Sequence, residues 1–370
     1  MPDIFPTIKR PTLLLDEKTA RRNLHSMALR ARQAGARFRP HFKTHQSAAI
    51  GEWFRDLEIN AITVSSVDMA QYFARAGWQD ILIAFPFNWR EIDEVNQLAS
   101  QIHLGLLVES RDTARFLNWH LNHPVDVWIK IDVGSQRTGL AWDDPEAVQA
   151  LAADLQRGRQ LRLRGLLTHA GHSYRARGAE EVCALHQQSM QRLTGLRDQL
   201  TQAGLPALEI SIGDTPSCSL CDCTGADELR PGNFLFYDVQ QSQIGSCQPA
   251  DIAVAVACPV VALHPERNEA VVFGGAIHLS KDAFDLDGRP AYGLVCLPQP
   301  NGWGAPLPGA FVRGLSQEHG VLHLPEEDLA RVRVGDLLCI LPAHSCLTVT
   351  LMRSYLTLTG QVVPTMHSPE

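Results

Sequence analysis

A lysine flanked by two histidines, Lys43 in the run Arg39-Pro-His-Phe-Lys-Thr-His45, is the first candidate for chemistry in this sequence. The run follows a short apolar segment, which places the lysine in a loop just after a predicted buried strand. Burial and the neighbouring positive charge of His41 and His45 would lower the pKa of the Lys43 amine and make it nucleophilic. Such an amine can form a Schiff base with an aldehyde cofactor. Clusters of lysine and histidine also occur in solvated loops, so the motif is weighed with the rest of the chain.

A second candidate lies far along the chain, in Pro342-Ala-His-Ser-Cys-Leu-Thr348. His344 and Cys346 are two residues apart, so on an extended strand both side chains would point to the same face. Imidazole with thiolate favours Zn²⁺ over Mg²⁺ or Mn²⁺, which prefer oxygen ligands. Two protein ligands leave positions open for water or substrate, as a catalytic metal requires. Taken alone, the pair also fits a buried cysteine beside an incidental histidine.

Two turns that contain glycine, Ser211–Ser217 and Arg230–Asn233, are suited to binding a phosphate group. Glycine lets backbone N–H groups approach an anion, Thr215 adds a hydroxyl donor, and the N-terminus of a following helix adds favourable partial charge. The alternative is a pair of ordinary turns rich in glycine and proline.

Other clusters of metal-binding residue types have plainer interpretations. Cys218, Cys221 and Cys223 form a C-x-x-C-x-C pattern with no matching second half nearby, which favours reduced structural thiols. His169 and His172 follow a predicted strand, where a histidine that supports a cofactor or a neighbouring arginine is the expected role.

The elements that must position these residues alternate regularly in the first two thirds of the chain. A helix is predicted over Asp16 to Gly35, with Asp16 as N-cap and Gly35 as the stop. Eight short apolar runs then predict parallel strands at Arg37–Pro40, Ala61–Ser65, Ile81–Ala84, Leu104–Val108, Val127–Asp132, Leu163–Thr168, Glu209–Gly213 and Glu228–Arg230. Eight such units predict an α/β (β/α)8 barrel, in which catalytic residues follow the C-terminal ends of strands. An open doubly wound sheet is the alternative, although no glycine-rich fingerprint follows the first strand.

After about Asn233 the pattern changes to one typical of a β domain rich in glycine and proline. Its apolar runs are Ile252–Cys258, Ala270–Phe273, Tyr292–Leu297, Leu337–Leu341 and Leu347–Leu351. The chain of 370 residues is 45% hydrophobic and 20% charged, as in ordinary globular proteins, and its net charge of −7 gives no reason to expect nucleic acid or membrane as a partner. No signal peptide or membrane span is predicted, and nine cysteines without such a signal favour reduced thiols in the cytoplasm.

Seven motifs in this order resemble the fold-type III pyridoxal-phosphate enzymes, in the branch of D-serine dehydratase and D-threonine aldolase. They are Pro40-His-Phe-Lys-Thr-His45, Asp132-Val-Gly-Ser-Gln-Arg-Thr-Gly139, Thr168-His-Ala-Gly-His172, Gly213-Asp-Thr-Pro-Ser217, Arg230-Pro-Gly232, Ser316-Gln-Glu-His-Gly320 and His344-Ser-Cys346. The resemblance implies an alanine racemase-like barrel over residues 12–245 and a mainly antiparallel β domain over 246–370, which residues 1–11 could join. It also implies a homodimer.

By the same resemblance, Lys43 would hold pyridoxal 5'-phosphate as the internal aldimine. Arg137 would lie against the phenolic oxygen of the cofactor, and Arg230 would lie where related enzymes place the partner of the pyridine nitrogen. The remaining cofactor contacts would be His169, Tyr174, Gly213, Thr215, Gly232 and Asn233. His344 and Cys346 would bind a divalent metal.

The resemblance implies a small D-β-hydroxy amino acid as substrate, with D-serine, D-threonine and D-threo-3-hydroxyaspartate all open. Because a thiolate ligand favours Zn²⁺, dehydration to a 2-oxo acid and ammonia is preferred over a D-threonine aldolase, which typically uses an oxygen-ligated ion such as Mn²⁺. A racemase would need a second base, for which Tyr292 and Tyr355 are candidates. A non-catalytic carrier of the cofactor would lack the β domain. His319, in Ser-Gln-Glu-His-Gly, is the least certain candidate near the metal or substrate.

Overall fold

The chain is divided into two compact units that interleave along the sequence. The computed structural model describes residues 4–368. One unit is formed by Met1–Leu24, Thr44–Ile50 and Asn233–Glu370, and the other by His25–Lys43 and Gly51–Gly232. Lys43 is thus the last residue of one segment, and its neighbour Thr44 begins a segment of the other unit.

The unit of His25–Lys43 and Gly51–Gly232 is built on an eight-stranded sheet in which every strand pair is parallel. In sheet order its strands are β2 (Arg37–Phe38), β10 (Glu228–Leu229), β9 (Glu209–Ile212), β8 (Leu161–Leu167), β6 (Val125–Asp132), β5 (His103–Val108), β4 (Asp80–Pro86) and β3 (Ala61–Val64). A two-residue strand, β7 (Leu140–Ala141), pairs with the end of β6. The run of buried residues in β5 and β6 reflects burial on both faces, as expected for a parallel sheet.

The two ends of this sheet meet, which makes it a barrel. The backbone N–H of Phe42 donates to the carbonyl of Thr63 at 2.8 Å, and the N–H of Thr63 donates to the carbonyl of Pro40 at 2.9 Å. These bonds continue β2 beyond Phe38 and join it to β3. The predicted (β/α)8 barrel is therefore confirmed, and the open doubly wound sheet is excluded.

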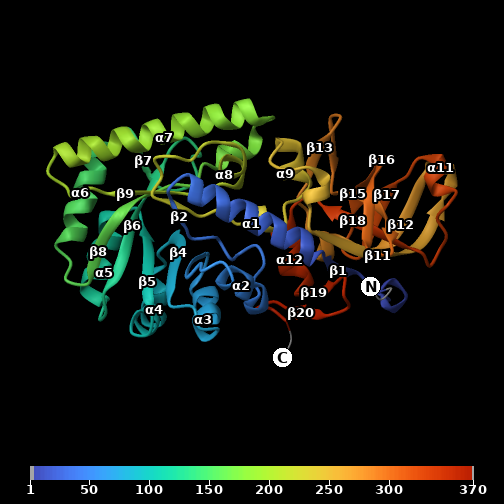
Figure 1. Cartoon of the computed structure of the whole chain (residues 1–370), viewed down its shortest axis with the longest axis horizontal. Coiled ribbons are helices and arrows are strands. Elements are labelled where there is room, and N and C mark those ends of the chain that lie inside the picture. The colour runs from blue at the N-terminus through green and yellow to red at the C-terminus, as the bar shows by residue number, and fades with distance from the viewer. Residues whose placement is uncertain (1–3, 369–370) are drawn as a thin grey trace. The chain divides into compact units, whose positions relative to one another are not determined.

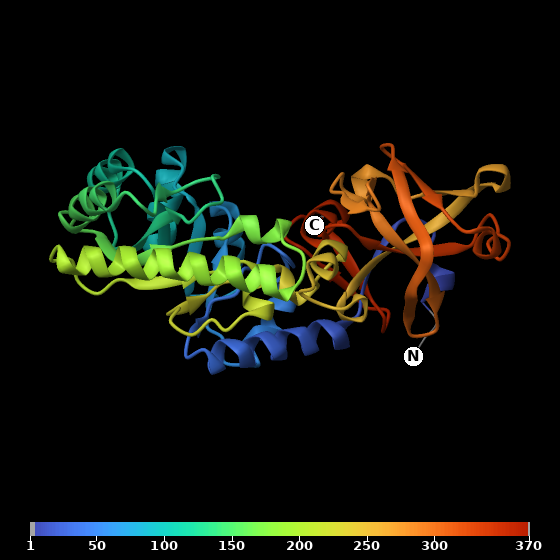
Figure 2. The ribbon, with the colours of Figure 1, turned by 90° about the horizontal axis from the view of Figure 1, so that it is seen from above.

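Helices follow the strands and cover the outside of the barrel (Figure 1). They are α2 (Ala48–Arg55), α3 (Val67–Arg75), α4 (Ile92–Ala99), α5 (Arg111–His120), α6 (Pro145–Gln156), α7 (Ala179–Gln202) and α8 (Thr215–Leu220). Several begin at a capping side chain: Ser66 accepts from Met69, Ser110 from Thr113 and Asp144 from Ala147. The long helix α7 runs along the barrel surface (Figure 2).

The predicted helix near the N-terminus is α1 (Glu17–Gln33). Its start follows the prediction, because the Asp16 carboxylate accepts from the backbone N–H of Thr19 at 3.0 Å. Its end does too, since Gly35 has a φ of +69°, which favours glycine after a helix.

The second unit is a nine-stranded, mainly antiparallel sheet. In sheet order its strands are β12 (Glu269–Phe273), β17 (His319–His323), β16 (Gly302–Leu315), β15 (Gly293–Gln299), β18 (Leu337–Pro342), β11 (Val254–His264), β1 (Thr12–Leu15), β19 (Ser354–Thr357) and β20 (Val362–Pro364). A small hairpin joins β13 (Phe284–Leu286) to β14 (Arg289–Ala291). The one parallel pair of this sheet among the described residues is β1 with β19.

This unit also contains the short helices α9 (Val239–Ile244), α10 (Ala276–Leu279), α11 (Glu326–Leu329) and α12 (Ser345–Met352). The run Leu347–Leu351, predicted as part of an all-β domain, lies in α12, so that part of the prediction is wrong. In Leu347-Thr-Val-Thr-Leu351 apolar residues alternate with threonine, which is typical of a strand, but the segment is helical in the fold. No helix within residues 4–368 is long and apolar enough to cross a membrane.

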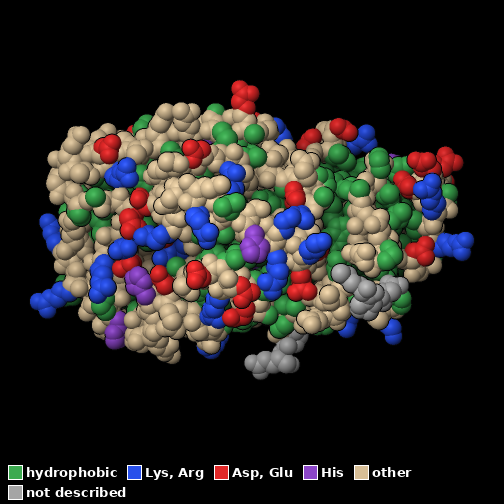
Figure 3. Space-filling model, in the orientation of Figure 1, with side chains coloured by type: hydrophobic (Ala, Val, Ile, Leu, Met, Phe, Trp, Pro, Cys, Tyr) green, Lys and Arg blue, Asp and Glu red, His purple; other side chains and the backbone are tan. Residues whose placement is uncertain are grey.

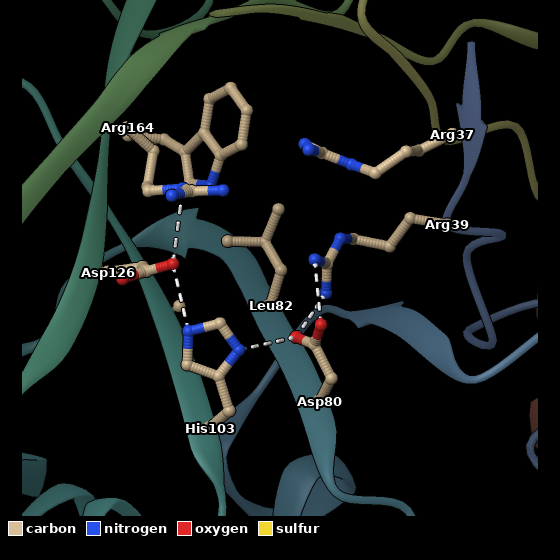
Figure 4. A pocket seen from close by; sticks show the side chains of 9 residues that line it. Arg37, Arg39, Asp80, Leu82, His103, Asp126 and Arg164 are labelled. Carbon is tan, nitrogen blue, oxygen red and sulfur yellow. Dashed lines mark hydrogen bonds and ion pairs between the residues drawn. The ribbon is translucent and has the colours of Figure 1, made fainter.

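Charged side chains fill the N-terminal end of the barrel (Figure 4). Arg39 donates to Asp80 at 2.6 Å and to the fully buried carboxylate of Glu228 at 2.7 Å. His103 lies between Asp80 and Asp126, at 3.3 Å and 2.9 Å. Charge pairs at this end serve stability in such barrels, because active sites occupy the opposite end. On the face shown in Figure 3, basic and acidic side chains are interspersed in the same way.

The cysteines differ from the predicted set of reduced thiols in one pair. Cys183 in α7 and Cys221, which caps the end of α8, form a disulfide with a Cα–Cα separation of 5.3 Å. Cys218 and Cys223 remain free and buried. The sequence pattern did not indicate this pair because its members are 38 residues apart and belong to different elements.

Candidate functional site

Four basic side chains gather around His169, which follows the C-terminal end of β8 in the barrel unit. The pKa of the His169 imidazole is well below its usual value because the ring is buried and because Lys43, Arg137, Lys130 and Arg230 add positive charge. The structure therefore brings together four of the predicted cofactor residues. Of these four side chains, Lys130 and Arg230 are buried, Lys43 is half-buried and Arg137 is exposed. Such a concentration of positive charge is suited to an anionic ligand.

Lys130 belongs to this cluster and was not predicted. Burial, followed by the charge of Arg230, lowers the pKa of its amine to about 8. Its Nζ donates to the carbonyl of Ile131 at 2.9 Å. A lysine within the otherwise apolar strand β6 was the signal that could have identified it, since buried lysines in apolar runs are rare.

The loop after β6 presents Arg137. The Asp132 carboxylate accepts from the backbone N–H groups of Gly134, Ser135 and Gln136, each at 2.8 Å. These three hydrogen bonds fold the loop around the Asp132 side chain and fix the backbone immediately before Arg137.

Arg230 is held rigidly between three strands. Its Nε donates to the Ser211 hydroxyl at 2.6 Å and its Nη2 to the Thr168 carbonyl at 2.7 Å. Burial lowers the pKa of its guanidinium to about 10, opposed by the nearby Glu228 carboxylate. Gly213 passes so close that a Cβ there would lie 2.8 Å from the Arg230 carbonyl oxygen, which explains the need for glycine. Gly232 lies in the loop that follows β10.

The start of α8 carries hydroxyl groups that lack partners. The Thr215 Oγ1 and Ser217 Oγ atoms are buried and have no hydrogen-bond partner among residues 4–368. Asp214 caps the helix by accepting from the Ser217 N–H at 3.0 Å. The Tyr174 hydroxyl lies 3.5 Å from the backbone nitrogen of Thr215. Buried hydroxyls without a partner are costly unless a ligand completes them. The residues present therefore fit the phosphate group of pyridoxal phosphate.

Replacing Thr215 with Val is expected to weaken pyridoxal phosphate binding about 10- to 100-fold, because a hydrogen bond to a charged group contributes roughly 1.5–3 kcal/mol. Fluorescence or absorbance titration of the cofactor-free protein measures this. Thr201→Val, on the exposed side of α7, serves as a matched control. Equal affinities in the two variants would contradict the assignment of the cradle.

His344 and Cys346 lie in the other unit, in a geometry that differs from the predicted strand. β18 ends at Pro342, His344 is the N-cap of α12, and Cys346 is in the first turn of that helix. The two side chains nevertheless meet. Burial disfavours the charged imidazole, but Cys346 and the Asp238 carboxylate outweigh burial and raise the pKa of His344 well above its usual value.

Three further side chains surround this pair. Asp238, fully buried, lies 3.0 Å from the His344 Nδ1. The Thr44 hydroxyl is 3.3 Å and the Asn233 amide nitrogen 3.7 Å from the Cys346 Sγ. Thr44 directly follows Lys43 in the chain. The Asn233 side chain, predicted as a phosphate contact, is thus part of the His344–Cys346 cluster.

These residues fit a divalent metal with soft ligands. Imidazole and thiolate are typical zinc ligands, and the side-chain amide oxygen of Asn233, Oδ1, is buried without a hydrogen-bond partner among the described residues. No group of three or more His, Cys, Asp or Glu side chains suited to a metal is found in the part of the chain that the structure describes. His344 and Cys346 stay the predicted pair of metal ligands.

The other candidates occupy different positions. His319 begins β17 and is exposed. Tyr355 is buried and its hydroxyl donates to the His45 carbonyl at 2.7 Å, which is a structural role. Tyr292 lies directly before β15, and its backbone N–H donates to the Val312 carbonyl at 2.9 Å. Asp238 was missed. Its place before α9 is a sequence signal for an N-cap, but its contact with His344 spans 106 residues and has no local signature.

Sequence comparison identifies two known domains in the chain. The family described as alanine racemase, N-terminal domain, matches residues 15–239, and the family of the serine dehydratase domain matches residues 253–358. D-threo-3-hydroxyaspartate dehydratase of Delftia sp. strain HT23 is 32% identical over 96% of this chain and 95% of its own. D-serine dehydratase of Dictyostelium discoideum is 28% identical over 95% of this chain and 94% of its own.

Solved structures give the same picture. The Delftia dehydratase superposes with a TM-score of 0.90 at 31% identity, covering 98% of this chain and 99% of that one. A variant of that enzyme with a cysteine replaced by alanine is described as its metal-free form. The D-threonine aldolase of Filomicrobium marinum has a TM-score of 0.83 at 23% identity, covering 97% and 95%, and shares the fold.

Proposed function

Because this chain belongs to the family that joins an alanine racemase N-terminal domain to a serine dehydratase domain, we propose that it is a dehydratase of D-β-hydroxy amino acids. It would depend on pyridoxal phosphate and Zn²⁺ and release a 2-oxo acid and ammonia. The observation that carries the proposal is the pair of His344 and Cys346, which offers a metal a thiolate in addition to an imidazole. The two dehydratase relatives support the same reaction class.

The cofactor residues have separate tasks in this proposal. Pyridoxal phosphate, when bound, supplies an electron sink that allows a bond at the substrate Cα to break. Lys43 would hold the cofactor covalently and, once released by the substrate amine, take the Cα proton. Thr215 and Ser217 would bind the phosphate with their unpaired hydroxyls, and Arg137 and Arg230 would balance negative charge on the ring.

The metal ligands answer a different problem, because hydroxide is a poor leaving group. A Lewis acid at the β-hydroxyl is expected to contribute several kcal/mol to its departure. His344 and Cys346 would hold that ion, and the Thr44 hydroxyl beside Cys346 follows Lys43 in the chain. In the proposed reaction, Lys43 takes the Cα proton of the substrate, and the ion held by His344 and Cys346 assists departure of the hydroxyl group from the same molecule.

Aldol cleavage of D-threonine is the second candidate, because a D-threonine aldolase shares the fold. Breaking Cα–Cβ requires removal of the β-hydroxyl proton, and the oxygen stays on Cβ as the carbonyl oxygen of the aldehyde product. The soft thiolate of Cys346 favours Zn²⁺ and dehydration over the oxygen-ligated ion, such as Mn²⁺, expected for the aldolase. We also propose a cytoplasmic homodimer, which size-exclusion chromatography with light scattering tests as to its oligomeric state.

Incubation with D-serine, D-threo-3-hydroxyaspartate and D-threonine tests the function. We expect a 2-oxo acid and ammonia in equimolar amounts from at least one of the first two, and none from the corresponding L-amino acids. The 2-oxo acid is measured by coupled reduction and ammonia by a separate assay. Glycine and acetaldehyde from D-threonine, with no 2-oxo acid from any of the three, would instead establish the aldolase.

A further inference from the structure

Asp238 occupies the centre of the His344–Cys346 cluster, although it is not one of the predicted metal ligands. Its carboxylate is fully buried. One oxygen, Oδ2, accepts from the Asn233 amide at 2.7 Å, from the His344 Nδ1 at 3.0 Å and from the Ser345 N–H at 3.0 Å. The other oxygen accepts from the Gln241 N–H at 2.9 Å and caps α9. With both oxygens engaged by donors, Asp238 is suited to orient its neighbours and unsuited to bind the metal itself.

The contact with His344 fixes which ring nitrogen faces outward. A carboxylate can only accept a hydrogen bond, so the Nδ1 of His344 must carry the proton. When the imidazole is neutral, its lone pair is then on Nε2, and this is the tautomer that can bind a metal through that atom. Carboxylates in this position orient metal-binding histidines in many proteins and raise their basicity.

Asn233 extends the same control to the thiolate. Its amide nitrogen donates to Asp238 and to the Ser345 hydroxyl at 3.0 Å, and lies 3.7 Å from the Cys346 Sγ. The alternative amide orientation would place its oxygen against the Asp238 carboxylate, which also can only accept. The orientation of the Asn233 amide is therefore set by Asp238, and with it the position of the amide nitrogen 3.7 Å from the Cys346 Sγ.

We propose that Asp238 is the positioning residue of the metal site, which aligns His344 directly and Cys346 through Asn233. The inference rests on the proposed metal-dependent function. The role of Asp238 is distinct from that of the ligands, because it sets how tightly and in what geometry this chain holds the ion. Asp238 can prove unimportant while His344 and Cys346 still bind the metal.

The test compares metal binding by the wild type and by Asp238→Asn, using purified cofactor-loaded protein stripped of metal. We expect the dissociation constants of Zn²⁺ and Co²⁺ to rise about 10- to 100-fold. We also expect the thiolate-to-Co²⁺ charge-transfer band to shift or weaken, which a merely destabilising change would not cause. Near-visible absorbance of pyridoxal phosphate should remain. Asp144→Asn, the same substitution at a helix cap in the barrel unit, is the matched control.

Affinity within twofold of the wild type, with an unchanged Co²⁺ spectrum, would overturn the role of Asp238. If Asp238→Asn does not fold, the zinc-loaded wild type decides the question by long-range ¹H–¹⁵N NMR, with His344 assigned through His344→Gln. We expect a protonated Nδ1 and a metal-bound Nε2, and a metal-bound Nδ1 would refute the inference. Failure of the wild type to bind either ion would instead count against the proposed function.

Discussion

Lys43→Ala is expected to abolish turnover and to remove the covalently bound cofactor. Loss of the Cα base alone costs about 10²–10⁴-fold in rate, and loss of the covalent attachment adds to this. The phosphate cradle and the other basic side chains around His169, those of Lys130, Arg137 and Arg230, are untouched by the change, so the variant should still bind pyridoxal phosphate reversibly. The measurement is the rate of 2-oxo acid formation together with the absorbance spectrum after gel filtration.

Lys18→Ala is the matched control, because Lys18 is an exposed lysine of α1. It should retain both the wild-type rate and the wild-type spectrum. If Lys43→Ala kept appreciable activity while cofactor stayed bound, Lys43 would not be the base, and the role proposed for it would have to be abandoned.

Removal of the metal is the second large effect that we expect. Without a Lewis acid at the leaving hydroxyl, the barrier should rise by several kcal/mol, which corresponds to about a 10³-fold loss of dehydratase activity. A strong chelator should produce this loss and added Zn²⁺ should reverse it. Cys346→Ala should show the same loss without recovery at equal Zn²⁺, because one of the two ligands is gone.

Cys296→Ala is the control that distinguishes loss of the metal from loss of core packing. Cys296 is a buried free thiol in the core of the same unit. It should lose stability and keep its metal-dependent activity. Full activity in thoroughly metal-depleted wild-type protein would show that His344 and Cys346 do not serve the reaction.

The barrel was predictable because strands buried on both faces leave a pattern that needs no knowledge of their partners. All eight barrel strands lie at or within about two residues of the predicted runs. Lys43 was recognisable for a similar reason, since its motif is local and follows the first barrel strand.

The features that sequence reasoning missed depend on contacts between distant residues. Asp238 and His344 are 106 residues apart, and the disulfide joins Cys183 to Cys221 across two helices. The start of α12 at Ser345 was missed because Leu347-Thr-Val-Thr-Leu351 alternates apolar and polar residues and is rich in β-branched side chains, as a strand would be. His344 and Cys346 lie close together even though they are not on a strand. An N-cap residue and a residue in the first turn of a helix can also bring their side chains together.

Lys130 is a second lysine that could hold pyridoxal phosphate in place of Lys43, and the two can be distinguished by experiment. Two amines, those of Lys43 and Lys130, contribute to the charge around His169, and the pKa of Lys130 is lowered to about 8. A lowered pKa is itself a property of nucleophilic lysines. The hydrogen bond from Lys130 to the Ile131 carbonyl favours a fixed, structural amine, whereas Lys43 follows the strand end in a loop.

Borohydride reduction of the cofactor-loaded protein, followed by peptide mapping with mass spectrometry, identifies the amine that holds pyridoxal phosphate. We expect one phosphopyridoxyl group per chain, attached to Lys43. Attachment to Lys130 or any other lysine, or no attachment in protein that has been saturated with the vitamer, would contradict the account.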